Sequence, residues 1–235
     1  DTHYLWTLDD EILLKRIQEE FSSMDHLYIA DGHHRSASAY QLYEELRKNN
    51  PQHTGNEPYN YFMSYIIPES NLKILEFNRL IKDLNGLSKE EFLIKLDNSF
   101  RIQNRKSTYY RPLEKHQFSM YLDGEFYSLH LRKLNFKIEN SLSHLDAQVL
   151  YKTVLEPILG IKDPRNDQRL DYAHGKKGMP HVKGLVDSGA FKVGFGMVPA
   201  SVEEMKNIAN EGLTMPPKST YIEPKLRSGI TIYEY

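Results

Sequence analysis

The chain contains no cysteine among its 235 residues. This absence excludes disulfide bonds, thiolate metal sites and a cysteine nucleophile. The sequence also has no apolar run long enough to cross a lipid bilayer, and no signal peptide is visible. We therefore expect a cytoplasmic protein with no membrane partner.

An excess of charge of either sign is also missing. The 30 Lys and Arg residues nearly balance 32 Asp and Glu residues, which gives a formal net charge of −2. Such a balance provides no general positive field to attract nucleic acid, so a nucleic-acid partner is not expected. A local basic stretch remains as an exception, at Arg101, Arg105, Lys106 and Arg111.

Several catalytic and metal-binding motifs are absent. The sequence has no G-x-x-x-x-G-K-[ST] loop, no G-x-G-x-x-G fingerprint and no G-x-S-x-G elbow. Ten histidines are present, but none belongs to an H-E-x-x-H motif. The adjacent His33 and His34 lack the i,i+4 spacing that places two imidazoles on one helix face. The sequence therefore predicts no metal site built from protein ligands alone.

The most informative segment that is present is Asp31–Arg35, which reads Asp-Gly-His-His-Arg. It follows an apolar run at 27–30, expected as a strand, and opens an amphipathic helix expected from about 35 to 48. The first turn of a helix has unpartnered N–H groups and a partial positive charge, and a glycine lets the backbone approach a ligand. This pattern predicts a phosphate site, whose candidate residues are Gly32, His33, His34, Arg35 and Ser36.

The side chains of this segment suggest individual roles. The guanidinium of Arg35 can hold two phosphate oxygens at once. Either histidine could exchange a proton near neutral pH, and Asp31 could ligate Mg²⁺ or orient a histidine. Asp31, His33 and His34 are thus the candidate catalytic residues. The competing interpretation is an ordinary Asp-Gly turn in which Asp31 only caps the helix.

Three further segments carry groups suited to an anionic substrate. Asn78 and Arg79 follow an expected strand, although an exposed salt bridge would also explain the arginine. Lys218, Ser219 and Thr220 lie in a proline-rich loop, for which chemistry alone favours a surface connection. Residues 174–178 form another cluster of glycine and basic residues, and a mobile solvated loop is the simpler interpretation there.

The Asp-Gly-His-His-Arg segment resembles the signature of a large, mostly uncharacterised bacterial and archaeal family related to the ParB/sulfiredoxin superfamily. The matching loop reads G-E-R-R in ParB proteins and G-C-H-R in sulfiredoxins. The resemblance extends over nearly the whole chain, and the other segments that carry it are 75–79, 83–86, 155–161, 215–221, 224–226 and 228–229.

The resemblance implies a nucleotide whose phosphates lie at the helix start. Archaeal free-serine kinases carry the same signature, which implies ATP or ADP with Mg²⁺, transfer of phosphate to a small hydroxyl-bearing acceptor such as serine, and a substrate-binding role for 218–220. Asn78 and Arg79 are further substrate-binding candidates, because an arginine after a strand could face the same cleft. Sulfiredoxin chemistry is excluded because its cysteine is missing. In those kinases a glutamate before the loop is the base, and no motif links Glu11, Glu19 or Glu20 to that role.

Two alternatives remain open. A ParB-like protein would use the nucleotide to control DNA or partner binding, and a non-catalytic domain would have no reaction at all. The chain begins with Asp1, and the resemblance implies that it is the C-terminal fragment of a longer protein. We expect a single unit over 1–235, with a soft boundary near 101–112.

The order of expected elements predicts an α+β, or mixed α/β, fold with a ParB/sulfiredoxin-like strand-loop-helix site. Asn85-Gly86 and Asp123-Gly124 are expected turns, the latter within a hairpin. Thr7, Ser88 and Ser201 are expected helix caps, the last two in capping boxes. The expected helices are 8–21, 88–100, 143–155, 181–187 and 201–210, and the expected strands are 59–67, 72–77, 117–122, 125–131, 169–173, 190–198 and 226–235.

Overall fold

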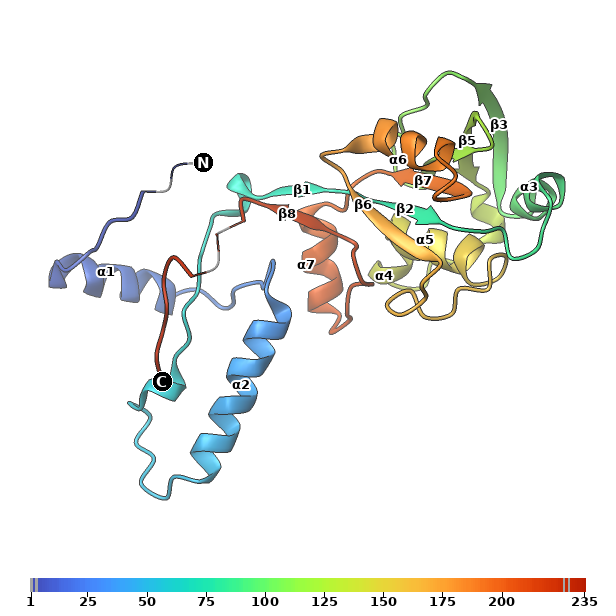
Figure 1. The fold of residues 1–235 in the computed structure, drawn as a ribbon. Helices are drawn as coiled ribbons and strands as arrows, with labels where there is room; N and C mark the ends of the chain where they lie inside the picture. The colour runs from blue at the N-terminus through green and yellow to red at the C-terminus, as the bar shows by residue number, and fades with distance from the viewer. Residues whose placement is uncertain (1, 3, 226, 228) are drawn as a thin grey trace. The chain divides into compact units, whose positions relative to one another are not determined.

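The computed structural model describes residues 2, 4–225, 227 and 229–235 (Figure 1). The chain divides into two compact units, Asp1–Asn60 and Tyr61–Tyr235. Each unit has its own secondary structure, and each is described by itself. Together their helices and antiparallel sheets make a mixed α+β fold, as the order of elements predicts.

The first unit contains two helices, α1 (Glu11–Ser22) and α2 (His33–Lys48), followed by a short 3-10 turn, η1 (Pro58–Asn60). Asp10 caps α1, because its carboxylate accepts the backbone N–H groups of Ile12 at 2.9 Å and Leu13 at 3.1 Å. The predicted cap at Thr7 is therefore wrong. An aspartate in the N-cap position satisfies two first-turn donors, which fixes the start of the helix there.

The predicted strand at 27–30 is also wrong, since these residues have no regular structure. Leu27 is 57% exposed and Ile29 is 52% exposed, and no strand of the described part of this unit pairs with them. A strand needs a neighbour for its N–H and C=O groups, whereas a helix satisfies its own. The helix that follows, α2, starts two residues earlier than expected and ends at Lys48 as expected.

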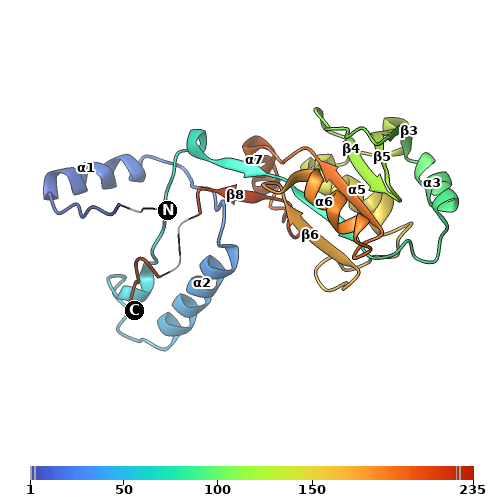
Figure 2. The same ribbon diagram turned by 45° about the horizontal axis from the view of Figure 1, so that its top comes forward.

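The second unit is built on a six-stranded sheet in which every neighbouring pair is antiparallel (Figure 2). Its strand order is β3-β5-β4-β7-β2-β6, and β1 and β8 pair separately. The strands are β1 (Lys73–Leu75), β2 (Phe77–Ile81), β3 (Phe100–Lys106), β4 (Gln117–Leu122), β5 (Glu125–Leu131), β6 (Leu170–His174), β7 (Val193–Met197) and β8 (Tyr221–Glu223).

Local signals place several turns and helices of this unit correctly. The hairpin between β4 and β5 turns at Asp123-Gly124, with φ of 51° and 80°, as I′-type geometry requires. Ser88 and Ser201 each form the predicted capping box. The helical segments are η2 (Glu69–Asn71), α3 (Lys89–Asp97), η3 (Lys133–Asn135), α4 (Ser141–His144), α5 (Asp146–Leu150), the π-helical η4 (Tyr151–Leu155), α6 (Gly178–Asp187) and α7 (Val202–Asn210).

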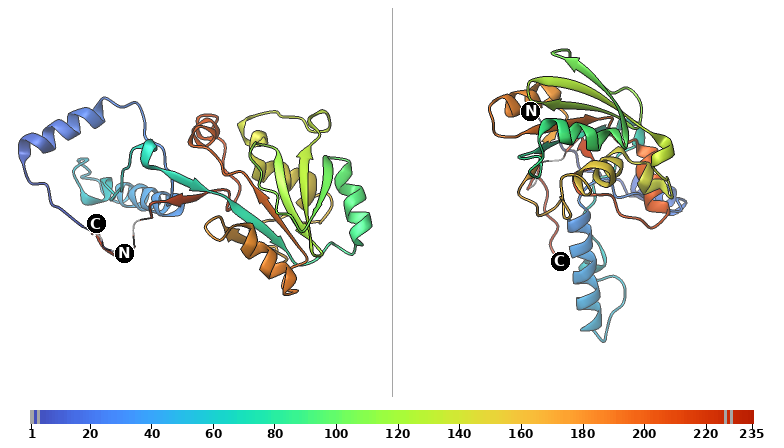
Figure 3. Two further views of the ribbon diagram at one scale, coloured as in Figure 1. Left: turned by 90° about the horizontal axis from the view of Figure 1, so that it is seen from above. Right: turned by 90° about the vertical axis from the view of Figure 1, so that its right-hand side faces the viewer.

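The sheet has an apolar core on each face. The larger core joins one face to α3, to the helical region 145–161 and to Ile208 of α7. The smaller core lies under α6, which crosses β7 and its neighbours (Figures 2 and 3). A Cβ at Gly194 would lie 2.1 Å from Val182 Cγ1, and one at Gly196 would lie 2.7 Å from Met179 Sδ. The two glycines of β7 therefore let α6 pack directly on the strand.

Three expectations for strands differ from the structure. Residues 61–67 have no regular structure and 58–60 form η1, so the predicted strand at 59–67 is wrong. Of the predicted strand at 226–235, Leu226 and Ser228 lie outside the described residues, and the described remainder is not a strand. The last strand is instead β8, and β3 occupies the start of the basic stretch 101–112, where no strand was expected.

Candidate functional site

The segment Asp31–Ser36 forms the start of α2 in the first unit. Gly32 occupies the N-cap position with φ 81° and ψ 25°, in the left-handed region, and its carbonyl accepts the backbone N–H of Ser36 at 3.0 Å. A residue with a side chain would be strained in this conformation. Gly32 thus adopts the backbone conformation with which the helix begins, and Asp31 precedes the cap position.

Arg35 folds back over this glycine. A Cβ at Gly32 would lie 3.1 Å from Arg35 Nη2 and 3.4 Å from Cζ. The guanidinium therefore lies beside the helix start, where first-turn N–H groups have no intrahelical partner and the helix dipole is positive. The guanidinium, the first-turn N–H groups and the helix dipole thus create a positive potential at one point. This point is accessible to solvent, since Arg35 and both histidines are exposed.

The predicted pair Asn78 and Arg79 is divided between the two faces of the sheet. Successive residues of a strand alternate between faces, and β2 pairs with both β6 and β7. Asn78 is 1% exposed and points to the α6 side, where its Oδ1 would lie 3.3 Å from a Cβ at Gly196. Its Nδ2 has no hydrogen-bond partner among the described residues.

Arg79 lies on the opposite face and is 3% exposed. Its Nη1 donates to the carbonyl oxygen of Phe77 and contacts Met197 Sδ at 3.8 Å. The guanidinium carbon lies 5.2 Å from the ring centre of Tyr172, a cation–π distance. No carboxylate of the described residues pairs with it, and burial lowers the pKa of Arg79 to about 10.

The proline-rich loop before β8 lies near Phe77, whose carbonyl oxygen accepts the hydrogen bond from Arg79. Lys218 has a φ of 52°, and its Nζ lies 5.6 Å from the ring centre of Phe77. Ser219 is buried, and its hydroxyl donates to Pro216 O at 2.8 Å, which commits it to the loop itself. Of the five residues proposed for substrate, Arg79 and Lys218 therefore meet at Phe77, and Thr220 is half-buried nearby in the chain.

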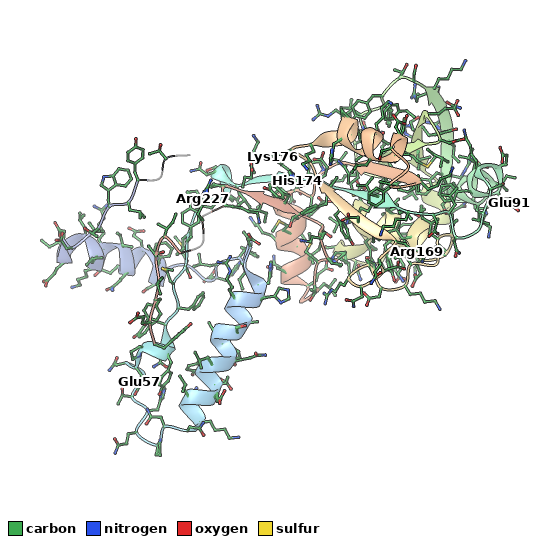
Figure 4. All side chains as sticks on the ribbon, viewed as in Figure 1. Glu57, Glu91, Arg169, His174, Lys176 and Arg227 are labelled. Atoms are coloured by element: carbon green, nitrogen blue, oxygen red, sulfur yellow. The ribbon has the colours of Figure 1, made fainter. Side chains whose placement is uncertain are left out.

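Three further rings belong to the cluster at Phe77, and of these the sequence pointed only to His174, within the basic segment 174–178. Tyr172 and His174 lie on β6 opposite Arg79 and Phe77, and Tyr221 begins β8. The rings of His174 and Tyr221 stack with centres 5.0 Å apart, and His174 Nδ1 is buried without a partner among the described residues. Figure 4 labels His174, the last residue of β6. The register between β2 and β6 places Tyr172 and His174, and the pairing of β8 with β1 places Tyr221. No spacing in the sequence signals either register. We call Phe77, Arg79, Tyr172, His174, Lys218 and Tyr221 the Arg79 cluster.

Two other segments that carry the family resemblance have structural roles. Asn85 Nδ2 donates to Ile158 O at 3.2 Å, and Arg169 Nη1 donates to Leu159 O at 3.0 Å and to Asp83 Oδ1 at 3.3 Å. These bonds join the turn at 83–86 to the segment at 155–161. Leu155, Leu159 and Ile161 are buried in the larger core. The pairing of these segments therefore reflects packing.

No helix in the part of the chain that the structure describes has the length and apolar character needed to cross a membrane. Within the same residues, no group of three or more His, Cys, Asp or Glu side chains is arranged to hold a metal ion.

Comparison with known proteins identifies the family. Residues 1–148 match the family described as Protein of unknown function (DUF1015). The match covers more than half of the chain, and the chain therefore belongs to this family. No curated protein matches it.

Some solved structures are similar to the chain. A free serine kinase variant in complex with AMP is 12% identical with a TM-score of 0.44, and the match covers 92% of this chain and 81% of that chain. A conserved hypothetical protein from Pyrococcus furiosus is 10% identical with a TM-score of 0.43, covering 90% and 81%. A free serine kinase variant in complex with ADP is 12% identical with a TM-score of 0.42, covering 92% and 81%. Because these TM-scores are low, the fold of this chain rests on its own sheet order and core.

Proposed function

We propose that this member of the family binds the phosphates of a nucleotide, ATP or ADP, at Gly32–Ser36 and serves in phosphate transfer to a small hydroxyl-bearing acceptor such as serine. One observation carries the proposal: Arg35 lies over a left-handed glycine at the N-terminus of α2. A helix start of this kind attracts anions, and a guanidinium beside it adds two further donors in a rigid fork.

The phosphates would bind to backbone N–H groups of the first turn and to the fork of Arg35. His33 and His34 are both exposed beside this point and would add donors from the side. A magnesium ion on a nucleotide commonly takes only one or two protein carboxylates, with phosphate oxygens and water as its other ligands. Asp31 is the carboxylate of this segment, which fits that requirement without a preformed metal site.

The acceptor follows from the likeness of the signature segment to that of free-serine kinases. In the transfer, an acceptor hydroxyl attacks the terminal phosphorus of the nucleotide, and the bond to the rest of the nucleotide breaks, so that ADP leaves from ATP or AMP leaves from ADP. The hydroxyl proton passes to a base. The glutamates that precede the loop, Glu11, Glu19 and Glu20, are exposed on α1. No sequence motif identifies any of these glutamates as that base, so nucleotide binding is the step to test first.

The test is calorimetric titration of the chain with ATP, ADP and CTP, each with magnesium. Arg35→Ala should weaken binding at least about tenfold, because a charge-assisted hydrogen bond contributes roughly 1.5–3 kcal/mol. Arg47→Ala is the matched control, since Arg47 lies on the last turn of the same helix. Gly32→Ala is a second variant, because an alanine would be strained at φ 81°.

Each outcome decides between the alternatives. Adenine-nucleotide binding that is lost in Arg35→Ala and kept in Arg47→Ala supports the proposal. A clear preference for CTP would favour the ParB-like switch and remove the kinase assignment. Binding that survives both Arg35→Ala and Gly32→Ala would place the nucleotide elsewhere. Absence of binding in every protein would leave the non-catalytic domain as the better description of the chain.

A further inference from the structure

Arg79 is a buried cation in the second unit that no described carboxylate neutralises. A buried cation is costly unless it is paired, and an arginine in this position normally faces a carboxylate. Arg79 instead has a backbone carbonyl, a thioether sulfur and the face of a tyrosine ring. The side chain is thus held in place by weak neutral contacts while its charge remains without a counter-ion.

The hydrogen bonds of Arg79 leave one edge of the guanidinium open. Both polar contacts, to Phe77 O and Met197 Sδ, use Nη1. No described residue accepts a hydrogen bond from Nε or Nη2. These two nitrogens present parallel N–H groups along one edge, which is the geometry that binds both oxygens of one carboxylate or phosphate.

Lys218 adds a second positive charge to the Arg79 cluster. Lys218 Nζ lies over Phe77, and no described carboxylate pairs with it. Glu223, on strand β8, is paired with Lys176, which follows β6. The position of Lys218 is also built in, since the residue has a left-handed φ of 52° that costs energy for a side chain other than glycine.

The aromatic rings favour one class of anion. Phe77 makes edge contacts with Tyr172 at 6.3 Å and with Tyr221 at 5.7 Å, so the two cations lie on a continuous set of rings. Apolar surroundings penalise a dianion more strongly than a monoanion, because the desolvation cost rises with charge. A planar carboxylate carries one negative charge and matches the two open N–H groups of a single guanidinium.

We propose that the Arg79 cluster is a binding site for the carboxylate group of a small molecule. The carboxylate lies against Nε and Nη2 of Arg79, and Lys218 closes over it from the loop before β8. Binding pairs the buried guanidinium and explains why that charge is kept on a strand in the core. The proposal concerns the second unit and does not depend on nucleotide binding at Gly32–Ser36.

The test is an NMR titration of the ¹⁵N-labelled full chain with acetate, acetamide and inorganic phosphate. Acetamide has the shape of acetate without its charge, and phosphate distinguishes a general anion site from a carboxylate site. We expect acetate to cause saturable shifts in the amides of 77–79, 172–174 and 218–221. Acetamide should cause none there, and phosphate should bind at least about tenfold more weakly.

Variants of Arg79 separate the contribution of its paired N–H donors from that of its positive charge. Arg79→Met should abolish the acetate shifts, and Arg79→Lys should weaken binding at least about tenfold because a lysine lacks the paired donors. Arg105→Met is the matched control, since Arg105 also lies 5.2 Å from a tyrosine ring centre, that of Tyr110, and has Ser128 as a partner. Lys218→Met gives a second variant in a loop, should a change at Arg79 unfold the sheet.

Three results would overturn the proposal. Equal shifts with acetate and acetamide would show that charge is not recognised. Acetate binding that persists in both Arg79→Met and Lys218→Met would place the site elsewhere. Tighter binding of phosphate than of acetate would replace the carboxylate with a phosphate group. If Arg79→Met or Lys218→Met loses acetate binding while its nucleotide titrations are unchanged, the carboxylate site is separate from the nucleotide site at Gly32–Ser36.

Discussion

The two units differ in what holds their elements in place. Neither helix of the first unit has a buried residue, and Ile12 on α1 is 81% exposed. In the second unit, α3 buries Phe92 and Leu96 completely, and the sheet has an apolar core on each face. In the first unit a side-chain cap fixes the start of α1 and a left-handed glycine the start of α2, whereas packing holds the elements of the second unit.

The difference shows what each kind of element needs. A helix closes its hydrogen bonds within itself, so α1 forms behind the cap of Asp10 with its apolar side uncovered. A strand depends on its neighbours, so residues 27–30 stay irregular, whereas β2 has β6 and β7 on its two sides. Apolar residues gain stability only where something covers them.

The largest expected effect in this comparison is a pH dependence that arises at Asp146 in the second unit. Asp146 is 1% exposed, and its Oδ1 accepts the backbone N–H of His116 at 2.7 Å. Burial raises the pKa of Asp146 from 3.8 to about 7, and the charge of Glu204 adds to this rise, while the His116 N–H and the charge of Lys115 oppose it. Burial also lowers the pKa of the neighbouring His116.

The sign follows from the raised pKa of Asp146. Below about pH 4 the carboxyl is protonated in both states, and above about pH 7 the folded state carries the cost of a buried charge. The free energy of unfolding should fall over this range by on the order of 4 kcal/mol, and Asp146→Asn should remove that fall. The lowered pKa of His116 makes the free energy of unfolding rise with pH instead. The quantity to measure by urea denaturation at several pH values is therefore the difference in free energy of unfolding between the unchanged protein and Asp146→Asn. Parallel pH profiles would contradict the prediction.

The next effect compares one apolar side chain from each unit. Leu96→Ala on α3 removes a fully buried side chain and should lower the free energy of unfolding by about 3 kcal/mol. Ile12→Ala on α1 should change it by less than about 0.5 kcal/mol, since 81% of that side chain is already exposed. Chemical denaturation measures both. A loss at Ile12 that approached the loss at Leu96 would show that the apolar side of α1 is covered in solution.

A smaller effect tests the packing of α6 on β7. Gly194→Ala would place a Cβ 2.1 Å from Val182 Cγ1, and we expect a loss of about 2 kcal/mol from overpacking. Gly184 is the control, because it lies on α6 with no atom within 4 Å of its Cβ position. Gly184→Ala should stabilise the helix by up to about 1 kcal/mol. Thermal unfolding that moved in the same direction for both would rule out the close approach as the cause.

The parts of the fold that could be predicted from the sequence are those with local causes. The capping boxes at Ser88 and Ser201 and the turn at Asp123-Gly124 lie where their residues predict. Strand identity was less predictable. The aromatic run at 61–67 is not a strand, whereas β3, which reads Phe-Arg-Ile-Gln-Asn-Arg-Lys, is one. As an outermost strand it exposes polar side chains, and its pairing with β5 has no local signal.

In the candidate sites too, only the features with local causes could be predicted from the sequence. Gly32 and Arg35 are three residues apart at a helix start, so their proximity could be predicted from the chain alone. Asn78 and Arg79 are adjacent in sequence, and for that reason the pleat of β2 sends them to opposite faces. Tyr172 meets Arg79 through strand register, which depends on the packing of the whole sheet. The role of each site residue in binding remains a prediction.

The two glycines of β7 have a consequence for how this protein can evolve. A side chain at 194 can be accepted only if residue 182 becomes smaller, and one at 196 only if Met179 retreats. Each pair of positions therefore changes together or not at all, although the partners lie more than ten residues apart in the chain. Among relatives that keep this sheet, we expect correlated substitutions at 182 with 194 and at 179 with 196, which would record the contact between helix and strand as a pattern of inheritance.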